Sequence, residues 1–199
     1  GWRNPAAVKN IWGLVERFKP EMLGSVPTVL AATLAIPPGN ADLSSLRYAA
    51  GGGSAIPVAV GHAIEQKFKI PVVEVYGMTE TSSVHTMAYP DRPIRLGSVG
   101  LPVPYSRVRV VKLDANNRVE RECAGDEIGV VLMAGPGVFR GYLNETHNEG
   151  AFVDGDWVNS GDLGRLDQDG YLWITGRAKD LVIRGGHNID PGPIEDIMF

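Results

Sequence analysis

The amino-acid sequence predicts an α/β protein: a partial parallel α/β subdomain over residues 1–90, a small antiparallel β-barrel-like subdomain over 91–176, and a short third part over 177–199. Two observations predict this division. Helical and strand patterns alternate along the first part, which is typical of a parallel sheet covered by helices. In the second part, short apolar runs are separated by turns rich in Asp, Asn and Gly, and no interval between them fits a helix of normal length.

The elements expected in the first part follow from the spacing of its apolar residues. Apolar residues recur at helical spacing in some stretches, and β-branched runs without that spacing occur in others. Pro57 suits the first turn of a helix, where its missing N–H costs nothing. We therefore expect a helix over 5–19, a helix over 25–34, a strand over 46–50, a helix over 57–68 and a strand over 70–75.

The second part is expected to contain strands over 106–113, 129–134, 153–159 and 171–174. A hairpin-like pattern over 181–184 and the start of a helix follow in the third part. The chain has no initiator Met, and its last residues look like a helix with no stop signal. We therefore expect that both ends are cut from a longer protein.

The composition limits the function. The chain has 199 residues, of which 44% are hydrophobic, so it can bury one core or two small ones. Its net charge of -4 provides no basic face, and nucleic acid is not expected as a partner. Cys123 is the only cysteine, which excludes an internal disulfide and favours a reducing, cytoplasmic location. No apolar run approaches the ~20 residues of a membrane span.

The most informative motif is Tyr76-Gly77-Met78-Thr79-Glu80-Thr81, which directly follows the strand expected over 70–75. Open α/β sheets bind their ligands at such strand ends. The motif combines an aromatic ring, a glycine, hydroxyl groups and one carboxylate. These groups suit a nucleotide, because a ring can stack on the base, hydroxyls can reach phosphate, and a carboxylate can bind Mg²⁺. The alternative is a solvated loop with the tyrosine packed in the core.

Two later polar segments complete the pattern: Ser160-Gly161-Asp162-Leu163-Gly164 and Gly176-Arg177-Ala178-Lys179-Asp180. Together with Tyr76–Thr81, and in the same order, they resemble motifs of the adenylate-forming (AMP-binding) superfamily, which includes acyl-CoA synthetases and the adenylation domains of peptide synthetases. The resemblance extends from about Pro27 to the last residue, and an acyl-CoA synthetase, or fatty-acid–CoA ligase, is the favoured member. It implies that the third part is the start of a C-terminal lid domain.

The resemblance assigns roles within the first motif. Tyr76 would flank the adenine, and Gly77 would border the acyl chain. Thr79 would contact phosphate and Glu80 would bind Mg²⁺, which makes these two the expected catalytic residues. Charge builds on the α-phosphate during adenylation, so the metal and the hydroxyl donors must already be in place. His85, further along the loop, is expected to be a polar lining residue or a surface residue rather than a catalyst.

The glycine-rich stretch that contains Gly52, Gly53 and Ser54 lies between a strand and a helix. It is neither a phosphate-binding P-loop nor a Rossmann fingerprint, because the required residues are missing. By itself it is best read as a tight turn. The resemblance implies that it lines the adenine and acyl pockets.

The later segments supply the remaining candidates. By resemblance, Asp162 accepts both ribose hydroxyls, and Arg177 bridges ribose and phosphate. Lys179 would be the hinge of the lid, and Asn188 would approach the nucleotide phosphate. The plain alternatives are a turn at Asp162 and a surface arginine at Arg177. The segments 97–102 and 138–142 also match the family, and we interpret them as a structural frame of the β subdomain.

The implied activity is that of an AMP-forming acid–thiol ligase. ATP would adenylate a carboxylic acid, expected to be a fatty acid, and CoA would then take the acyl group; the cofactors and co-substrates are ATP/AMP, Mg²⁺ and CoA. The phosphate loop and the catalytic lysine of the family have no match in this chain, and Lys179 does not replace that lysine. We therefore expect the chain alone to be folded but inactive.

Three alternatives stay open: an adenylating enzyme that loads a carrier protein, a non-catalytic nucleotide-binding module, and a purely structural β domain. The carboxylic acid is not identified by the sequence. A homo-oligomer is kept as an alternative to a monomer.

Overall fold

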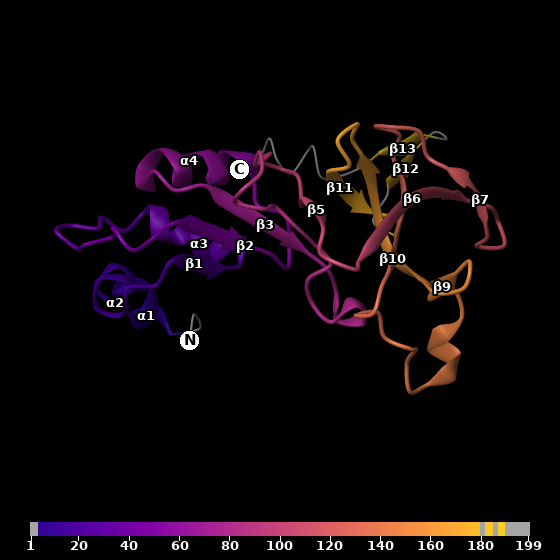
Figure 1. Cartoon of the computed structure of the whole chain (residues 1–199), viewed down its shortest axis with the longest axis horizontal. Helices are drawn as coiled ribbons and strands as arrows, with labels where there is room; N and C mark the ends of the chain where they lie inside the picture. The colour runs from indigo at the N-terminus through magenta and orange to yellow at the C-terminus, as the bar shows by residue number, and fades with distance from the viewer. Residues whose placement is uncertain (1–3, 180–181, 185–186, 190–199) are drawn as a thin grey trace. The chain divides into compact units, whose positions relative to one another are not determined.

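The computed structural model describes residues 4–179, 182–184 and 187–189. The chain divides into two compact units (Figure 1). We call them the α/β unit, with residues 1–75 and 88–97, and the β unit, with residues 76–87 and 98–199. The α/β fold class predicted from the sequence is confirmed, with a parallel sheet followed by an antiparallel one. The predicted boundaries at residues 90 and 176 stay a prediction.

The α/β unit alternates helices and parallel strands. Strands β1, β2 and β3 pair in that order, with Leu23 opposite Ala49 and Ala49 opposite Val72. All three residues are buried, and Leu30 and Ile64 from two helices share their core. The elements are α1 (Pro5–Lys9), α2 (Ile11–Phe18), β1 (Met22–Ser25), α3 (Pro27–Leu34), β2 (Tyr48–Gly51), α4 (Val58–Phe68) and β3 (Val72–Tyr76).

Two expectations for this unit were wrong in detail. The helix expected over 5–19 is interrupted at Asn10, and Asn4 caps its first piece by accepting from the Ala6 N–H at 2.9 Å. The helix expected from residue 25 begins only at Pro27, because residues 22–25 form strand β1. This strand has four residues and includes a glycine, so its sequence carries little strand signal.

The β unit is built on an antiparallel sheet with the strand order β11-β10-β8-β6-β7, to which β9 adds beside β10. Two short antiparallel pairs, β4 with β5 and β12 with β13, accompany it. Its elements are the 3₁₀ turn η1 (Thr79–Thr81), β4 (Thr86–Met87), β5 (Leu101–Pro102), β6 (Arg107–Leu113), β7 (Val119–Glu122), β8 (Gly129–Ala134), the 3₁₀ turn η2 (Glu145–Asn148), β9 (Phe152–Val153), β10 (Trp157–Leu166), β11 (Leu172–Arg177), β12 (Val182–Arg184) and β13 (His187–Ile189).

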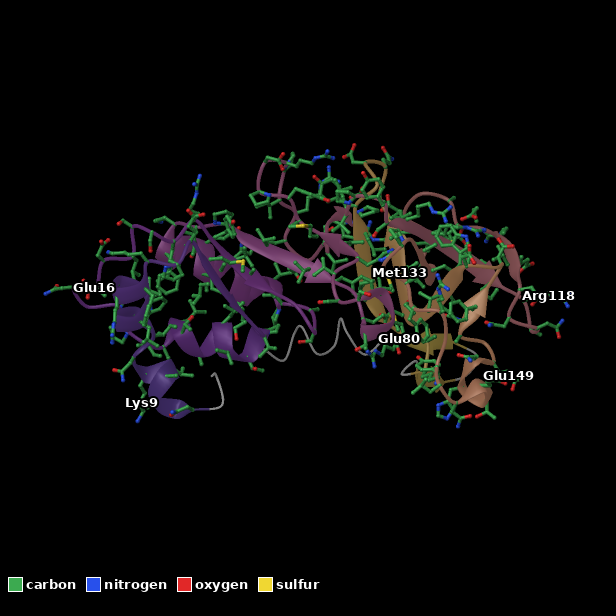
Figure 2. The ribbon with its side chains drawn as sticks, turned by 60° about the horizontal axis from the view of Figure 1, so that its bottom comes forward. Lys9, Glu16, Glu80, Arg118, Met133 and Glu149 are labelled. Carbon is green, nitrogen blue, oxygen red and sulfur yellow. The ribbon has the colours of Figure 1, made fainter. Side chains whose placement is uncertain are left out.

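Strand β8 is the centre of this sheet and is buried on both faces. Val131 and Met133 pack in one apolar cluster, whereas Leu132 packs in another. Met133 lies among the strands in Figure 2, while Arg118 and Glu149 lie in outer loops of the unit. A strand covered on both faces reads as a continuous apolar run, which is why residues 129–134 were predicted with correct bounds.

Strand β10 is longer than expected and holds one of the predicted site residues. The strand expected over 153–159 is interrupted by a turn, where Asp154 and Gly155 have φ angles of 52° and 85°. From Trp157 the strand continues to Leu166, so Asp162 lies within a strand and the plain-turn alternative for it was wrong. The pairing of β10 with β8 shifts its register between Asn159 and Leu163, and Gly161, with φ of 74°, lies within this irregular stretch.

Candidate functional site

The Tyr76–Thr81 motif forms the end of β3 and the turn η1, and its geometry is held by a side chain of the motif itself. The Thr81 hydroxyl accepts from the Met78 N–H at 3.1 Å and donates to the Met78 carbonyl oxygen at 3.0 Å. Thr81 is buried, whereas Thr79 is exposed and Glu80 is half-buried. The buried hydroxyl thus fixes the turn, and the two expected catalytic side chains stay at least partly accessible to solvent.

Gly77 has a steric function in this loop. A Cβ atom at Gly77 would lie 1.8 Å from the Ser83 carbonyl oxygen. The close approach follows from the loop doubling back, with the His85 N–H donating to the Tyr76 carbonyl oxygen at 2.8 Å. Glycine is therefore required by backbone packing, whatever ligand lies nearby.

His85 is buried, which excludes the surface position that was one of its two expected places. It is 1% exposed, and its Nε2 lies 3.0 Å from the Arg107 carbonyl oxygen. Burial lowers the pKa of His85 below its ordinary value. The expectation of a surface residue was wrong, because the same doubling back of the loop carries the imidazole into the interior.

Tyr76, Asp162 and Arg177 form one hydrogen-bonded chain. The Tyr76 hydroxyl donates to Asp162 Oδ2 at 2.6 Å, and Arg177 Nε donates to Asp162 Oδ1 at 3.2 Å. Asp162 is 9% exposed, and Arg177 lies opposite it in the β10–β11 ladder. Burial, followed by the nearby Asp162 charge, raises the pKa of Tyr76, so its hydroxyl stays a donor. Three residues that the sequence placed in a nucleotide site are thus in contact.

The backbone around Asp162 is also braced. Ser160 Oγ donates to the Val131 carbonyl oxygen at 2.8 Å and accepts from the Asp162 N–H at 3.0 Å. The Gly161 N–H donates to Asn159 Oδ1 at 3.0 Å. The side chain of Arg177 is 72% exposed, so it can move to another partner at little cost. The carboxylate is therefore fixed, and the guanidinium is adaptable.

Glu80 is held by the segment 135–142, which follows β8. The Phe139 N–H donates to the Glu80 carbonyl oxygen at 2.8 Å, and the Tyr142 hydroxyl donates to Glu80 Oε1 at 2.5 Å. Ser82 Oγ donates to the Gly137 carbonyl oxygen at 2.7 Å. The sequence led us to interpret residues 138–142 as a structural frame. Tyr142 was not among the candidates that the sequence offered, although the family match of its segment was a signal that it lies near the Tyr76–Thr81 motif.

Glu80 fits the chemistry of a magnesium ligand. In the described residues, no group of three or more His, Cys, Asp or Glu side chains could hold a metal by itself. Mg²⁺ in nucleotide sites is usually bound by one or two carboxylates together with substrate phosphates and water. A single half-buried carboxylate on a turn with exposed Thr79 is consistent with that arrangement.

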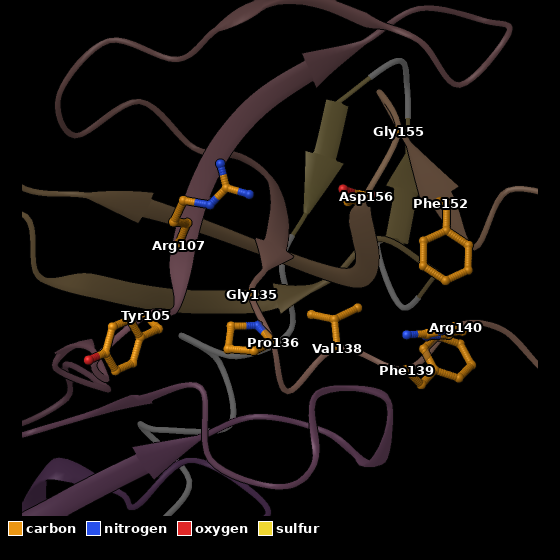
Figure 3. Close-up of a pocket in the computed structure, with 10 residues that line it drawn as sticks. All are labelled: Tyr105, Arg107, Gly135, Pro136, Val138, Phe139, Arg140, Phe152, Gly155 and Asp156. Carbon is orange, nitrogen blue, oxygen red and sulfur yellow. The ribbon is translucent and has the colours of Figure 1, made fainter.

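A cavity of about 760 Å³ lies in the β unit beside the segment that holds Glu80 (Figure 3). Arg107 on β6 lines one part of it, and Phe139 and Arg140 of the segment 135–142 line another. Among the described residues that line this cavity, none belongs to the predicted nucleotide or acid site. Phe139 thus lines the cavity, and its backbone N–H also holds the Glu80 carbonyl oxygen.

The other predicted residues lie elsewhere in the chain. Gly52, Gly53 and Ser54 follow β2 in the α/β unit, with Gly53 and Ser54 exposed. A Cβ at Gly52 would lie 2.6 Å from Val75 Cγ2, so close packing explains that glycine as well. Lys179 is exposed in the turn after β11. The backbone of Asn188 lies in β13, and its side chain lies outside the described residues.

Glu74 is a buried carboxylate that the sequence did not single out. It is 4% exposed, its Oε2 accepts from the Ile56 N–H at 3.3 Å, and its Oε1 accepts from the Gly97 N–H at 3.1 Å. Burial raises the pKa of Glu74, and the two N–H donors oppose that shift. It fixes the loop after Gly52–Ser54 to β3, which is a supporting function.

Comparisons with known proteins agree with the motifs. The sequence model of the family described as AMP-binding enzyme matches residues 2–143. The chain is 44% identical over 198 residues to marinolic acid–CoA ligase of a Pseudoalteromonas strain, covering 100% of this chain and 30% of that protein. It is 38% identical over 157 residues to 2-succinylbenzoate–CoA ligase of Bacillus licheniformis, covering 78% and 31%.

Solved structures give the same result. O-succinylbenzoate coenzyme A synthetase of Bacillus subtilis, in complex with ATP and magnesium ion, aligns with a TM-score of 0.82 and 32% identity over 96% of this chain and 39% of that chain. An anthranilate CoA ligase in complex with anthranoyl-AMP aligns with a TM-score of 0.83 and 29% identity, covering 97% and 36%. The chain thus spans only 30% to 39% of the length of these relatives.

No helix in the described part of the chain is long and apolar enough to cross a membrane. With the matched family covering most of its length, this chain belongs to the AMP-binding enzymes, the adenylate-forming family of the CoA ligases named above.

Proposed function

We propose that the protein is an AMP-forming acid–thiol ligase that activates a carboxylic acid with ATP and transfers the acyl group to CoA. The observation that carries this proposal is the contact of Tyr76, Asp162 and Arg177. A ring for the adenine, a carboxylate for the ribose and a cation for the phosphate occur there in one hydrogen-bonded chain. That set matches a nucleoside monophosphate.

In the first half-reaction, a carboxylate oxygen of the acid attacks the α-phosphorus of ATP. The new P–O bond gives an acyl-AMP, and the bond to pyrophosphate breaks. Asp162 accepts hydrogen bonds from the ribose hydroxyls, and Tyr76 flanks the base. Thr79 donates to a phosphate oxygen, and Arg177 bridges phosphate and ribose. Mg²⁺ held by Glu80 would neutralise charge that builds on the phosphate.

In the second half-reaction, the sulfur of CoA attacks the acyl carbon. The thiol loses its proton, the thioester bond forms, and AMP leaves with the electrons of the broken C–O bond. Gly52, Gly53 and Ser54 line the adenine and acyl pockets in this proposal, and Gly77 borders the acyl chain. Lys179 is the hinge about which the lid turns, and Asn188 approaches the phosphate.

For the acid, we propose a fatty acid. The supporting comparisons are a medium-chain fatty-acid–CoA ligase of Escherichia coli, 37% identical over 181 residues, and a long-chain-fatty-acid–CoA ligase of Bacillus subtilis, 29% identical over 187 residues. Relatives named for succinylbenzoate and indoleacetate show that the family accepts other acids. A cytoplasmic location stays a prediction, and so does a homo-oligomer.

The test is AMP release from ATP and Mg²⁺ by the full-length protein over a panel of fatty, aromatic and dicarboxylic acids, with and without CoA. Release that depends on CoA and yields a thioester supports the proposal and identifies the acid. Pyrophosphate exchange that depends on the acid but gives no CoA thioester favours the carrier-loading enzyme. No release and no exchange from the folded protein contradicts both and favours a nucleotide-binding module.

Two variants sharpen this test. Asp162→Ala removes the proposed ribose acceptor and is expected to abolish most of the activity. Asp91→Ala removes an exposed loop carboxylate and is the matched control, with activity unchanged. Equal activity of the two variants would contradict the proposed role of Asp162.

A further inference from the structure

Tyr142 has a backbone that is fixed at two points. Its N–H donates to Asn148 Oδ1 at 2.7 Å, and its carbonyl oxygen accepts from Asn148 Nδ2 at 3.3 Å. The preceding residue, Gly141, has φ of 133°, and a Cβ there would lie 3.0 Å from Asn148 Oδ1. A loop side chain that bonds both backbone groups of one residue holds that residue in a defined place.

The ring of Tyr142 is fixed as well. It packs edge-on against Phe139, with ring centroids 4.8 Å apart and an interplanar angle of 72°. Phe139 in turn stacks on Phe152 with ring centroids 5.4 Å apart, and His147 lies edge-on to the Tyr142 ring with centroids 6.1 Å apart. Because a tyrosine has only two rotatable side-chain bonds, these contacts determine where its hydroxyl lies.

That hydroxyl lies on the carboxylate proposed to bind the metal. It donates to Glu80 Oε1 at 2.5 Å, so the phenol proton points to this carboxylate oxygen. In the part of the chain that the structure describes, Glu80 Oε2 has no hydrogen-bond partner. One oxygen is therefore held, and the other is left for a ligand.

We propose that Tyr142 is a positioning residue that orients the Glu80 carboxylate for the metal ion of the bound nucleotide. This inference rests on the proposed function. A glutamate has three rotatable side-chain bonds and loses much conformational freedom when it binds an ion. A carboxylate whose orientation is already fixed loses less, and partners of metal ligands commonly affect metal affinity for this reason.

The experiment separates metal binding from nucleotide binding in the full-length protein. Binding of ATP is measured by isothermal titration calorimetry, with no acid present so that no turnover occurs, once with MgCl₂ and once with excess EDTA. For Tyr142→Phe we expect affinity in Mg²⁺ to fall by about 10-fold, while affinity in EDTA is unchanged. Tyr105→Phe is the matched control with no loss in either buffer, since Tyr105 is 86% exposed.

A second variant protects the test from a folding defect. Asn148→Ala keeps the Tyr142 hydroxyl but frees its backbone, and we expect a smaller loss confined to the Mg²⁺ buffer. Thermal unfolding of every variant is measured alongside. Equal loss in both buffers, or wild-type affinity of Tyr142→Phe in Mg²⁺, overturns the inference and leaves the proposed function standing. No ATP binding by the wild-type protein in either buffer overturns the proposed function and the inference together.

Discussion

The hydroxyl of Tyr76 donates to Oδ2 of Asp162 at 2.6 Å, although the two residues lie 86 positions apart in the chain. Tyr76 ends strand β3, and Asp162 lies within strand β10. The contact serves both residues, because a half-buried phenol benefits from an acceptor and a buried carboxylate needs donors. It also orients the tyrosine ring and the carboxylate relative to each other, which a nucleotide site requires.

Replacing Tyr76 by phenylalanine removes this hydrogen bond and leaves Asp162 Oδ2 without its donor. We expect the free energy of unfolding to fall by about 1–3 kcal/mol, since a hydrogen bond to a charged group is lost. Urea unfolding followed by fluorescence measures the change. Tyr105→Phe, at an exposed position, should stay within about 0.5 kcal/mol of the wild type. Equal stability of the two variants would show that the bond contributes nothing to folding.

Asp162→Asn tests the ribose contact without removing volume. We expect AMP affinity to fall by about 10-fold or more, because hydrogen bonds from the ribose hydroxyls to a charged acceptor are weakened. Affinity for 2′,3′-dideoxyadenosine monophosphate, which lacks both hydroxyls, should be low in the wild type and should not fall further. Calorimetric titration of both ligands checks this. A parallel loss for the two nucleotides would mean that the substitution acts through the fold.

Gly77→Ala is expected to be strongly destabilising. Its new methyl group would lie 1.8 Å from the Ser83 carbonyl oxygen, so the loop after β3 must move. We expect a loss of at least about 3 kcal/mol. Gly125→Ala is the control, because a Cβ at Gly125 has nothing within 4 Å, and its loss should stay below about 1 kcal/mol. Thermal or urea unfolding of both variants decides between these outcomes.

His85 is expected to make the folded protein less stable as the pH falls into the acidic range. Burial lowers its pKa in the folded protein below the ordinary 6.5, so the folded state stays neutral where the unfolded state takes up a proton. Protons bound by the unfolded chain favour unfolding, and stability contributed by His85 is lost as the pH falls below 6.5. Urea unfolding from about pH 5 to pH 8 should show this slope, and His85→Gln should reduce it.

Glu74 is expected to have the opposite effect, so that its contribution to stability falls as the pH rises. Its pKa is raised above the ordinary 4.5, so above that pH the folded state holds a proton that the unfolded state has released. Its contribution to stability therefore falls as the pH rises from 4.5 to the folded pKa. Glu74→Gln should remove this fall while leaving the His85 slope. Because the two effects have opposite signs, only the single variants separate them.

The sequence predicted the elements whose signal is local. Strand β8 and helix α4 were found because burial imposes a continuous apolar run on one and helical spacing on the other. Strand β7 was missed because its residues, Val119–Glu122, are mostly charged and exposed. Strand β1 was missed because it is short and contains a glycine. Tertiary pairing forms both strands, and no local pattern reports it.

In the candidate site, too, the sequence predicted what local motifs encode and missed what depends on tertiary contacts. The Tyr76, Asp162 and Arg177 contacts were predictable as a group because each residue lies in a motif with nucleotide chemistry. The contact of Tyr142 with Glu80 joins segments 62 positions apart. It depends on the path of the chain after β8, which residue types alone do not reveal. The burial of His85 and Glu74 likewise follows from how loops return to the sheet.

The backbone ladder between β10 and β11 ends close to the proposed hinge. Asp162 is paired with Arg177, and the Ala178 N–H donates to the Gly161 carbonyl oxygen at 2.9 Å. Lys179 is the next residue and is exposed. If the lid turns at Lys179, the rotation begins just beyond the last anchored peptide, and the residues proposed to bind ribose do not have to shift. The β10–β11 hairpin would then stay in place while the lid rotates, so that the nucleotide is bound in the same position during both half-reactions.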